Sequence, residues 1–374
     1  MTGRIDLDFN ATTPVAPEVV SAMLPFLDEV IGNPSSRHWA GLPARDAVER
    51  ARSQVASLLC CDATEIVLTS GGTEANNHAI LGVFFSHRAS GKPFHVISSL
   101  IEHPAILEPC RFIESLGAEV TRVPVDRFGC VDPADVAAAM RPQTALVSIM
   151  HANNEVGTIQ PIAEIARIAH EQGALCHTDA AQSVGKIATD VEILGVDLLT
   201  VAGHKLYGPK GVGALFVREG VKLEPFLHGA GQEAGRRAGT ENVLAIVGLG
   251  AACELALEWM DDSHLQTLRD EFWNQLQNTF GNRVVLNGHP EQRLPNTLNV
   301  SFCGERGQEI LDRLPNLAAS TGSACHAGRL QMSPVLTAMG ISPEVGLGTI
   351  RFSLGRTTTL AEIEATVSML TGCV

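Results

Sequence analysis

Short apolar segments alternate with helical stretches through the first two thirds of the chain, and this alternation restricts its fold more than any other feature. The apolar segments cover residues 65–69, 94–98, 145–150, 174–178, 197–201 and 212–217. Nearly continuous apolar strands of this kind are buried in a mostly parallel sheet, because the helices between them cover both of its faces. The sequence therefore predicts an α/β fold that binds its ligands at the carboxyl ends of the strands.

From about Leu257 the pattern changes. The segments here are a polar helical stretch at 261–279, strands near 284–286, 297–302 and 349–354, and a stretch rich in Gly, Ser and Ala at 318–328. This mixed order predicts a smaller α+β domain. The chain has 374 residues, of which 45% are hydrophobic, so it is long enough for two domains and a large buried core.

The charge and cysteine content exclude several classes of function. A formal net charge of −14 argues against direct binding to nucleic acid or to an anionic membrane, because no basic surplus neutralises phosphates. The most apolar helical stretch, 243–257, contains Glu254 and is expected to be a core helix rather than a membrane span. The nine cysteines form no CxxC pair and no zinc-like spacing, so no metal site is expected. Without a secretory signal pattern, the sequence predicts reduced thiols and a cytoplasmic protein.

Two residues at predicted strand ends carry groups suited to a carbonyl-bearing cofactor. The chain has only five lysines, and Lys205 follows the strand 197–201 directly, where an amine can be desolvated and can attack a carbonyl carbon. Asp179 follows the strand 174–178, where a carboxylate is costly unless it meets a cation such as a protonated pyridine nitrogen. A surface lysine in a turn and an aspartate that caps a helix are the alternative interpretations.

The segment 69–74 leads from a strand through Gly71 and Gly72 into a helix. Backbone N–H groups at such a helix start, together with the Thr73 hydroxyl, form a seat for a phosphate group. The segment is neither a Walker A loop nor a GxGxxG fingerprint, so by itself it indicates only an anion site.

Three further residues are candidates for chemistry. His103 follows a strand and can stack on a flat cofactor or move protons, although an ordinary loop histidine is the simpler interpretation. Arg351 lies inside an apolar strand, where it can bind a carboxylate or form a structural salt bridge. Cys325 lies among small residues at 320–328 beside His326, which is typical of an accessible nucleophile but also of a free loop thiol.

Taken together, these motifs resemble the cysteine desulfurases of the NifS/IscS-like group, within the class V aminotransferase branch of pyridoxal 5'-phosphate (PLP) enzymes of fold-type I. The likeness runs from the segment 7–14, Leu-Asp-Phe-Asn-Ala-Thr-Thr-Pro, to the segment 351–356, Arg-Phe-Ser-Leu-Gly-Arg. It implies a large PLP-binding domain at 15–256 with a mostly parallel seven-stranded sheet. It also implies a small α+β domain made of 1–14 and 257–374, which carries the Cys325 loop and Arg351.

The resemblance also implies a homodimer and a set of PLP-binding residues: Gly72, Thr73, His103, Asn154, Asp179, Gln182, Ala202, His204 and Lys205, with Thr240 from the neighbouring subunit. In this arrangement Lys205 holds PLP, Asp179 pairs with the pyridine nitrogen, Gln182 pairs with the ring hydroxyl and His103 stacks on the ring. Asn33 and Arg351 would hold the substrate carboxylate. Many desulfurases have a serine where this chain has Ala202, so PLP retention is expected to be weaker.

The implied reaction converts L-cysteine to L-alanine and leaves a persulfide on Cys325, which passes sulfur to an acceptor protein for iron–sulfur clusters, thio-cofactors or nucleic-acid modification. Selenocysteine lyases resemble the chain closely as well, and would act on L-selenocysteine. Pro104 does not separate the two, because desulfurases often have Lys there and the lyases Asp. Another class V lyase or transaminase, in which Cys325 is dispensable, and a non-catalytic scaffold are the remaining alternatives.

Overall fold

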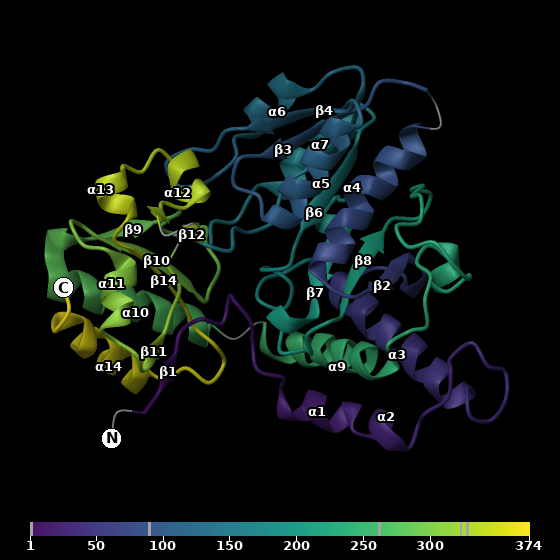
Figure 1. Ribbon diagram of the computed structural model, residues 1–374, viewed down its shortest axis with the longest axis horizontal. Coiled ribbons are helices and arrows are strands. Elements are labelled where there is room, and N and C mark those ends of the chain that lie inside the picture. Colours follow the sequence, from purple (N-terminus) through teal and green to yellow (C-terminus); the bar gives the residue numbers. More distant parts are fainter. Residues whose placement is uncertain (1–2, 89–90, 261–262, 322–323, 327–328) are drawn as a thin grey trace.

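The computed structural model describes residues 3–88, 91–260, 263–321, 324–326 and 329–374, and for 324–326 and 329–331 it describes the backbone alone. Figure 1 shows a larger part built around one wide sheet and a smaller part, to its left, built around a short sheet. The C-terminus lies in the smaller part, and the N-terminal segment passes beside it before it reaches the larger part (Figure 1).

The wide sheet has seven strands in the order β2-β8-β7-β6-β5-β3-β4. Their bounds are β2 Ile66–Thr69, β3 His95–Ser99, β4 Glu119–Val123, β5 Thr144–Ser148, β6 Leu175–Asp179, β7 Leu198–Ala202 and β8 Gly213–Val217. β8 pairs antiparallel with both of its neighbours, whereas the other four strand pairs are parallel. The predicted mostly parallel, seven-stranded sheet is therefore confirmed.

Six of these strands coincide with the apolar segments of the sequence to within one or two residues, and β4 does not. β4 lies at the edge of the sheet, where Glu119 is exposed and only Val123 is buried. An edge strand that is partly solvated alternates polar and apolar residues instead of forming an apolar run. For this reason the rule that identified the buried strands did not identify β4.

Helices cover both faces of the wide sheet (Figure 1). On one face, buried residues come from α1 (Pro17–Met23), α3 (Leu42–Leu59), α6 (Pro133–Ala139), α7 (Ile162–Glu171), α8 (Val191–Leu194) and α9 (Val243–Trp259). On the other face they come from α4 (Gly72–Arg88) and α5 (Pro104–Ser115). In β7, Leu199 and Val201 pack in the first cluster and Leu198 in the second. Burial on both faces explains why the strands are apolar without alternation.

The smaller part contains a three-stranded antiparallel sheet in the order β14-β10-β9, with bounds Thr349–Ser353, Thr297–Phe302 and Val284–Asn287. The helices α10 (His264–Phe280), α11 (Gly307–Asp312) and α14 (Leu360–Thr371) share its buried cluster. The short β1 (Ile5–Asp6) pairs parallel with β11 (Leu317–Ala318) beside it. The remaining α-helices and strands of the described residues are α2 (Pro25–Asp28), β12 (Ala324–His326), β13 (Arg329–Gln331), α12 (Pro334–Ala338) and α13 (Pro343–Gly346). The division into domains at 15–256 and at 1–14 with 257–374 stays a prediction.

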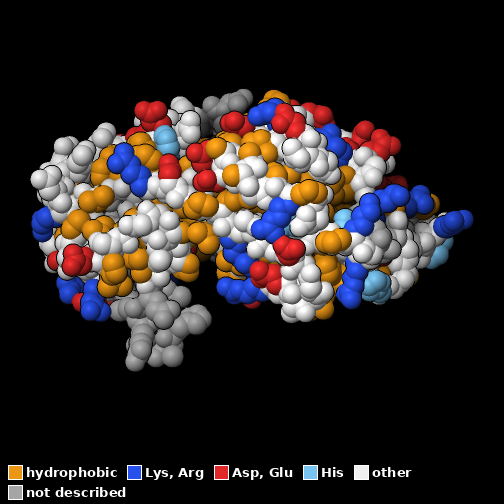
Figure 2. Space-filling model, turned by 90° about the horizontal axis from the view of Figure 1, so that it is seen from above, with side chains coloured by type: hydrophobic (Ala, Val, Ile, Leu, Met, Phe, Trp, Pro, Cys, Tyr) orange, Lys and Arg blue, Asp and Glu red, His pale blue; other side chains and the backbone are white. Residues whose placement is uncertain are grey.

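The surface in Figure 2 has a hollow between the two parts, and its acidic and basic side chains are interspersed. Within the described ranges, no single helix has the length and apolar character needed to cross a membrane. α9 and the helical stretch 264–283 meet the criteria of length and apolar character only when they are taken together. The two are bent by 71° relative to each other.

Candidate active site

A cavity of about 350 Å³ lies at the carboxyl ends of the parallel strands. It is lined by ten of the thirteen predicted site residues: Gly72, Thr73, His103, Asn154, Asp179, Gln182, Ala202, His204, Lys205 and Arg351. The strands place them there directly, because β6 ends at Asp179 and β7 ends at Ala202, just before Lys205. A parallel sheet brings such strand ends to one edge, which is where the sequence predicts the ligand site.

The helix α4 begins beside this cavity at Gly72, and its first turn contains Thr73. The turn before it lies against β8: a Cβ atom on Gly213 would lie 2.4 Å from the Val201 carbonyl oxygen and 2.8 Å from the Gly71 Cα atom. Only a glycine at position 213 lets the Gly71 turn approach β8 this closely. The first N–H groups of a helix have no acceptor within the helix, so this helix start can receive an anion.

Lys205 reaches from the end of β7 to the N-terminal segment. Its Nζ atom donates hydrogen bonds to the carbonyl oxygens of Asn10, at 2.6 Å, and Ala11, at 2.7 Å. Desolvation, assisted by the positive charge of Arg351, lowers the pKa of the Lys205 amine to about 8. Near neutral pH a fraction of this amine is therefore unprotonated and able to act as a nucleophile.

This low pKa predicts the pH dependence of PLP capture by the apoprotein. Only the unprotonated amine attacks the aldehyde, so the rate of covalent capture should rise about tenfold per pH unit below pH 8 and level off above it. Stopped-flow absorbance of PLP mixed with apoprotein at pH 6 to 10 measures this profile. A rate that keeps rising up to about pH 10.4, as for an ordinary lysine, would contradict a desolvated Lys205.

The carboxyl group of Asp179 is held in one orientation. Asn76 donates from Nδ2 to Oδ2 of Asp179 at 2.6 Å, and the Ala181 backbone N–H donates to Oδ1 at 2.9 Å. Asp179 ends a buried strand and does not cap a helix, so the cap alternative fails. The Oδ1 atom of Asn76 also lies at the cavity, buried and without a partner among the described residues.

Two histidines lie at the cavity as neutral rings. His103 caps α5: its Nδ1 atom accepts the Ala105 N–H at 3.1 Å, which leaves the ring proton on Nε2. Desolvation lowers the pKa of His103. Desolvation and the charges of Lys205 and Lys210 lower the pKa of His204 to about 4. A neutral imidazole can lie against a flat ring or donate one hydrogen bond to an oxygen.

Arg351 connects the cavity to the N-terminal segment and to the smaller part. One terminal nitrogen donates to the Asn154 carbonyl oxygen at 2.9 Å, and the other pairs with Asp8 Oδ1 at 2.7 Å. Its Nε atom is buried without a partner among the residues described here. Arg351 therefore forms a structural ion pair and also lines the cavity, and its binding of a substrate carboxylate stays a prediction.

The segment that carries Cys325 is anchored at both ends beside the cavity. Ser320 forms backbone hydrogen bonds in both directions with Arg351, and its hydroxyl donates to Asp8. At the other end, Ser333 donates from its hydroxyl to Glu155, next to Asn154. The backbone of Cys325 belongs to β12, and its side chain lies outside the part of the chain that is described.

Comparison with known proteins places the chain in a family. Residues 5–366 match the family model described as aminotransferase class V. The chain belongs to the class V aminotransferase family. Relatives include the cysteine desulfurase IscS of Dictyoglomus turgidum, 49% identical over 99% of this chain and 94% of that one. Another is the cysteine desulfurase IscS of Methanosarcina thermophila, 47% identical over 97% and 90% of the two chains.

Solved structures of class V relatives share the fold. A NifS-like protein is 37% identical, with a TM-score of 0.92 over 99% of this chain and 98% of that one. A structure described as SspA in complex with cysteine is 39% identical, with a TM-score of 0.83 over 94% and 98% of the two chains. These likenesses confirm the predicted fold-type I and the resemblance to the NifS/IscS-like group.

The cofactor of class V aminotransferases of this group is PLP, and the cavity fits it. An amine with a pKa of about 8 and an oriented carboxyl group lie at the ends of the neighbouring strands β7 and β6. At the start of α4, a Cβ atom on Gly72 would lie 3.2 Å from the Ala202 Cβ atom, so a side chain at this position would crowd the helix start that faces the cavity, and glycine keeps it open. The unpartnered Asn76 Oδ1 atom is a further polar group that a ligand can satisfy.

Two predicted site residues of this class V chain lie elsewhere within the single chain. Asn33 and Thr240 are exposed and do not line the cavity. Asn10 and Asn76 line the cavity, although neither is among the site residues predicted from the sequence. Asn76 lies three residues after Thr73 on α4, so helical spacing could have placed it on the same face. Asn10 reaches the cavity through tertiary folding, for which its local sequence contains no signal.

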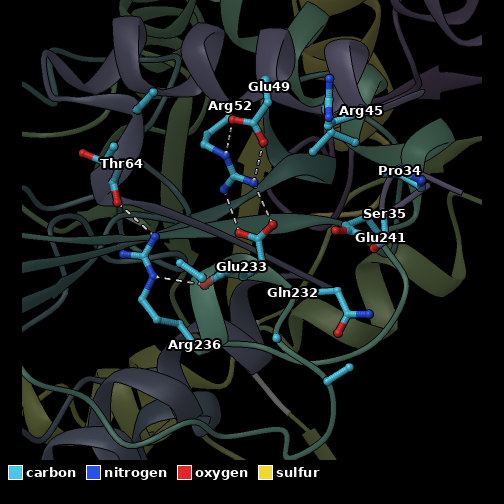
Figure 3. A pocket seen from close by; sticks show the side chains of 15 residues that line it. Pro34, Ser35, Arg45, Glu49, Arg52, Thr64, Gln232, Glu233, Arg236 and Glu241 are labelled. Carbon is cyan, nitrogen blue, oxygen red and sulfur yellow. Dashed lines mark hydrogen bonds and ion pairs between the residues drawn. The ribbon is translucent and has the colours of Figure 1, made fainter. Parts of the chain in front are cut away.

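A wider cavity of about 610 Å³ lies between α3 and the segment 230–241 (Figure 3). Figure 3 shows Arg52 between Glu49 and Glu233, and its terminal nitrogens donate to the two Glu233 oxygens at 2.7 Å each. Arg236 donates to the Thr64 carbonyl oxygen at 2.9 Å. Arg52 and Arg236 are thus paired with groups of the chain itself and hold the segment that leads to Thr240, whereas the Oε2 atom of Glu241, which also lines this cavity, is buried without a partner among the described residues.

Proposed function

We propose that this chain is a PLP-dependent cysteine desulfurase that converts L-cysteine to L-alanine and leaves a persulfide on Cys325. The observation that carries the proposal is one cavity lined by Lys205, Asp179 and Arg351, with Ser320 and Ser333 of the Cys325 segment hydrogen-bonded to residues at or next to its lining. The cysteine desulfurase names of relatives 44–49% identical over nearly the whole chain support it, as does a 39% identical neighbour solved with cysteine.

Each lining residue has a task in this proposal. When bound, PLP supplies an electron sink that acidifies the Cα proton of an amino acid. Lys205 holds PLP between turnovers and, with its low pKa, moves the proton at Cα near neutral pH. Asp179 faces the pyridine nitrogen, and the start of α4 with Thr73 and His204 receives the phosphate group. Arg351 offers its buried guanidinium to the substrate carboxylate.

The sulfur transfer itself uses the Cys325 thiolate as a nucleophile on the substrate sulfur. The Cβ–S bond of the substrate breaks and an S–S bond to Cys325 forms. The proton lost by the Cys325 thiol is balanced by one gained at Cβ, so that L-alanine and a persulfide result. The anchors at Ser320 and Ser333 place both ends of this segment beside the residues that line the cavity. No external oxidant or reductant is needed for this half of the reaction.

Product analysis with two substrates tests this function. PLP-loaded protein with L-cysteine and a thiol reductant should give alanine and sulfide in equal amounts. Catalytic alanine release from L-selenocysteine with none from L-cysteine would identify a selenocysteine lyase instead. Alanine from neither substrate would refute the proposed reaction while leaving the PLP site intact.

A homodimer is part of the proposal, because Thr240 and Asn33 do not reach the cavity of their own chain. Large apolar side chains are exposed along the segment 24–39, which contains Asn33: Leu24, Leu27, Ile31 and Trp39, with Trp39 86% exposed. Exposed apolar side chains gathered in one segment are typical of a subunit interface. The second copy would bring Thr240 to the phosphate group of its neighbour.

Replacing Ile31 and Trp39 together by glutamate should therefore separate the subunits. We expect the mass in light scattering to fall by half and the PLP dissociation constant to rise about tenfold, because a phosphate hydrogen bond is lost. Leu360→Glu, at an exposed apolar position on α14, is the matched control and should change neither quantity. A double variant that keeps the mass of the wild type would count against this interface.

The sulfur acceptor and the location complete the proposal. We infer that the persulfide passes to an acceptor protein for iron–sulfur cluster biogenesis, as the IscS name of the relatives suggests, and that the protein works in the cytoplasm.

A further inference from the structure

A second lysine lies beside the cavity without a role in the proposed reaction. Lys186 follows β6 by seven residues, and its Nζ atom donates to Gln182 Oε1 at 2.9 Å and to Asn10 Oδ1 at 3.3 Å. It lines a separate small cavity of about 40 Å³, together with aromatic residues that include Tyr207 and Trp259. Desolvation, with the nearby charges of Lys205 and Arg351, lowers the pKa of Lys186 to about 7. Burying a charged amine costs free energy of desolvation, so its presence here suggests a specific role.

The hydrogen bonds of Gln182 show what Lys186 does there. An amide side chain has one acceptor end and one donor end. A charged lysine amine can donate hydrogen bonds but cannot accept them. The Lys186 amine donates to Gln182 Oε1, so the oxygen end of the amide faces it. The nitrogen end then faces the cavity side, where Nε2 donates to the Asn10 carbonyl oxygen at 3.0 Å. Gln182 itself is buried and lines the PLP cavity.

Asn10 connects the two lysines. Its carbonyl oxygen accepts from Lys205 and from Gln182, and its side-chain oxygen accepts from Lys186 and from Asn296. The charged groups that face Lys186 are Lys205, Arg351 and Arg356, the last across the small cavity. Tyr207 is the further titratable group that lines this small cavity. Lys186 is therefore hydrogen-bonded to Gln182 directly and connected to Lys205 through Asn10.

We propose that Lys186 is a positioning residue that fixes the Gln182 amide with its N–H₂ group toward the ring hydroxyl of PLP. The inference rests on the proposed contact between Gln182 and that hydroxyl. Without Lys186, the amide can rotate by half a turn and present its oxygen to the ring oxygen, which replaces a hydrogen bond by repulsion. A donor at the ring oxygen favours its deprotonated form.

The test compares Lys186→Met with the wild type in three measurements: the PLP dissociation constant of the apoprotein, the pH midpoint of the visible absorption change of bound PLP, and thermal unfolding without PLP. We expect PLP binding about tenfold weaker and a midpoint about one pH unit higher. The unfolding temperature should not fall, because methionine replaces the amine by an apolar group of similar length. Lys222→Met, which removes an exposed lysine, is the matched control.

The same substitution in a Gln182→Leu background decides whether Lys186 acts through Gln182. The proposal predicts that both shifts largely disappear there, since the two residues act as one unit. Unchanged binding and midpoint in Lys186→Met, or equal shifts in both backgrounds, would overturn it. If Lys186→Met does not fold, Lys186→Gln, which ends one bond short of the amine, undergoes the same comparison. Turnover of L-cysteine by the wild type reports on the proposed function separately.

Discussion

Replacing Cys325 by alanine should reduce alanine release from L-cysteine by a factor on the order of 10³ or more, because no other group takes the substrate sulfur. PLP binding and its absorption spectrum should stay those of the wild type, since the Cys325 segment is anchored through Ser320 and Ser333 and not through the thiol. Steady-state assays of alanine and sulfide, with a PLP titration of the variant, measure both effects.

The matched control for this prediction is Cys303→Ala. Cys303 is a partly buried free cysteine of the smaller part, in the segment after β10. Its replacement should leave turnover within about twofold of the wild type, because a substitution away from the site changes stability little. Full activity of Cys325→Ala would exclude the persulfide mechanism and would favour a class V lyase that eliminates sulfur directly.

Replacing Lys205 by alanine is the second prediction with a large effect. Turnover should fall by about 10⁴-fold, since the variant loses both the attachment point of PLP and the amine that moves the Cα proton. Reduction with borohydride followed by mass spectrometry should find PLP attached to Lys205 in the wild type and no attached PLP in the variant.

Lys210→Ala is the control for Lys205→Ala, because Lys210 is exposed and lies in the same segment. It should retain covalent PLP and most of the turnover. Covalent PLP on another lysine of the wild type, Lys186 above all, would show that the assignment of Lys205 is wrong.

Much of the fold follows from the sequence because burial on both faces of a parallel sheet leaves a clear pattern. The segments that became β5, β6 and β7 are buried without alternation, and the strand order places them at the centre of the wide sheet. The edge strand β4 has no such run and was not predicted. Pairing partners such as β1 with β11 join residues more than 300 positions apart, and a local pattern contains no information on them.

Some residues of the candidate site could likewise be predicted from the sequence, and others could not. Lys205 and Asp179 follow strands, so the topology of a parallel sheet brings them together once the strands are identified. Asp8 and Asn10 come from a segment before the first strand of the wide sheet, and their contacts with Arg351, Lys205 and Gln182 depend on the final packing. Lys186 and Gln182 are only four residues apart, so their hydrogen bond is local in sequence. Its relation to the cofactor site becomes visible only when the position of the cavity is known.

In the proposed reaction sulfur passes from L-cysteine to Cys325, and a single measurement tests this transfer directly. PLP-loaded protein, mixed with one equivalent of L-cysteine without reductant and alkylated at once, is digested and analysed by mass spectrometry. We predict that the peptide containing Cys325 gains the mass of one additional sulfur atom beneath the alkyl group, in an amount equal to the alanine formed. Alanine formed without added sulfur on that peptide would contradict the account.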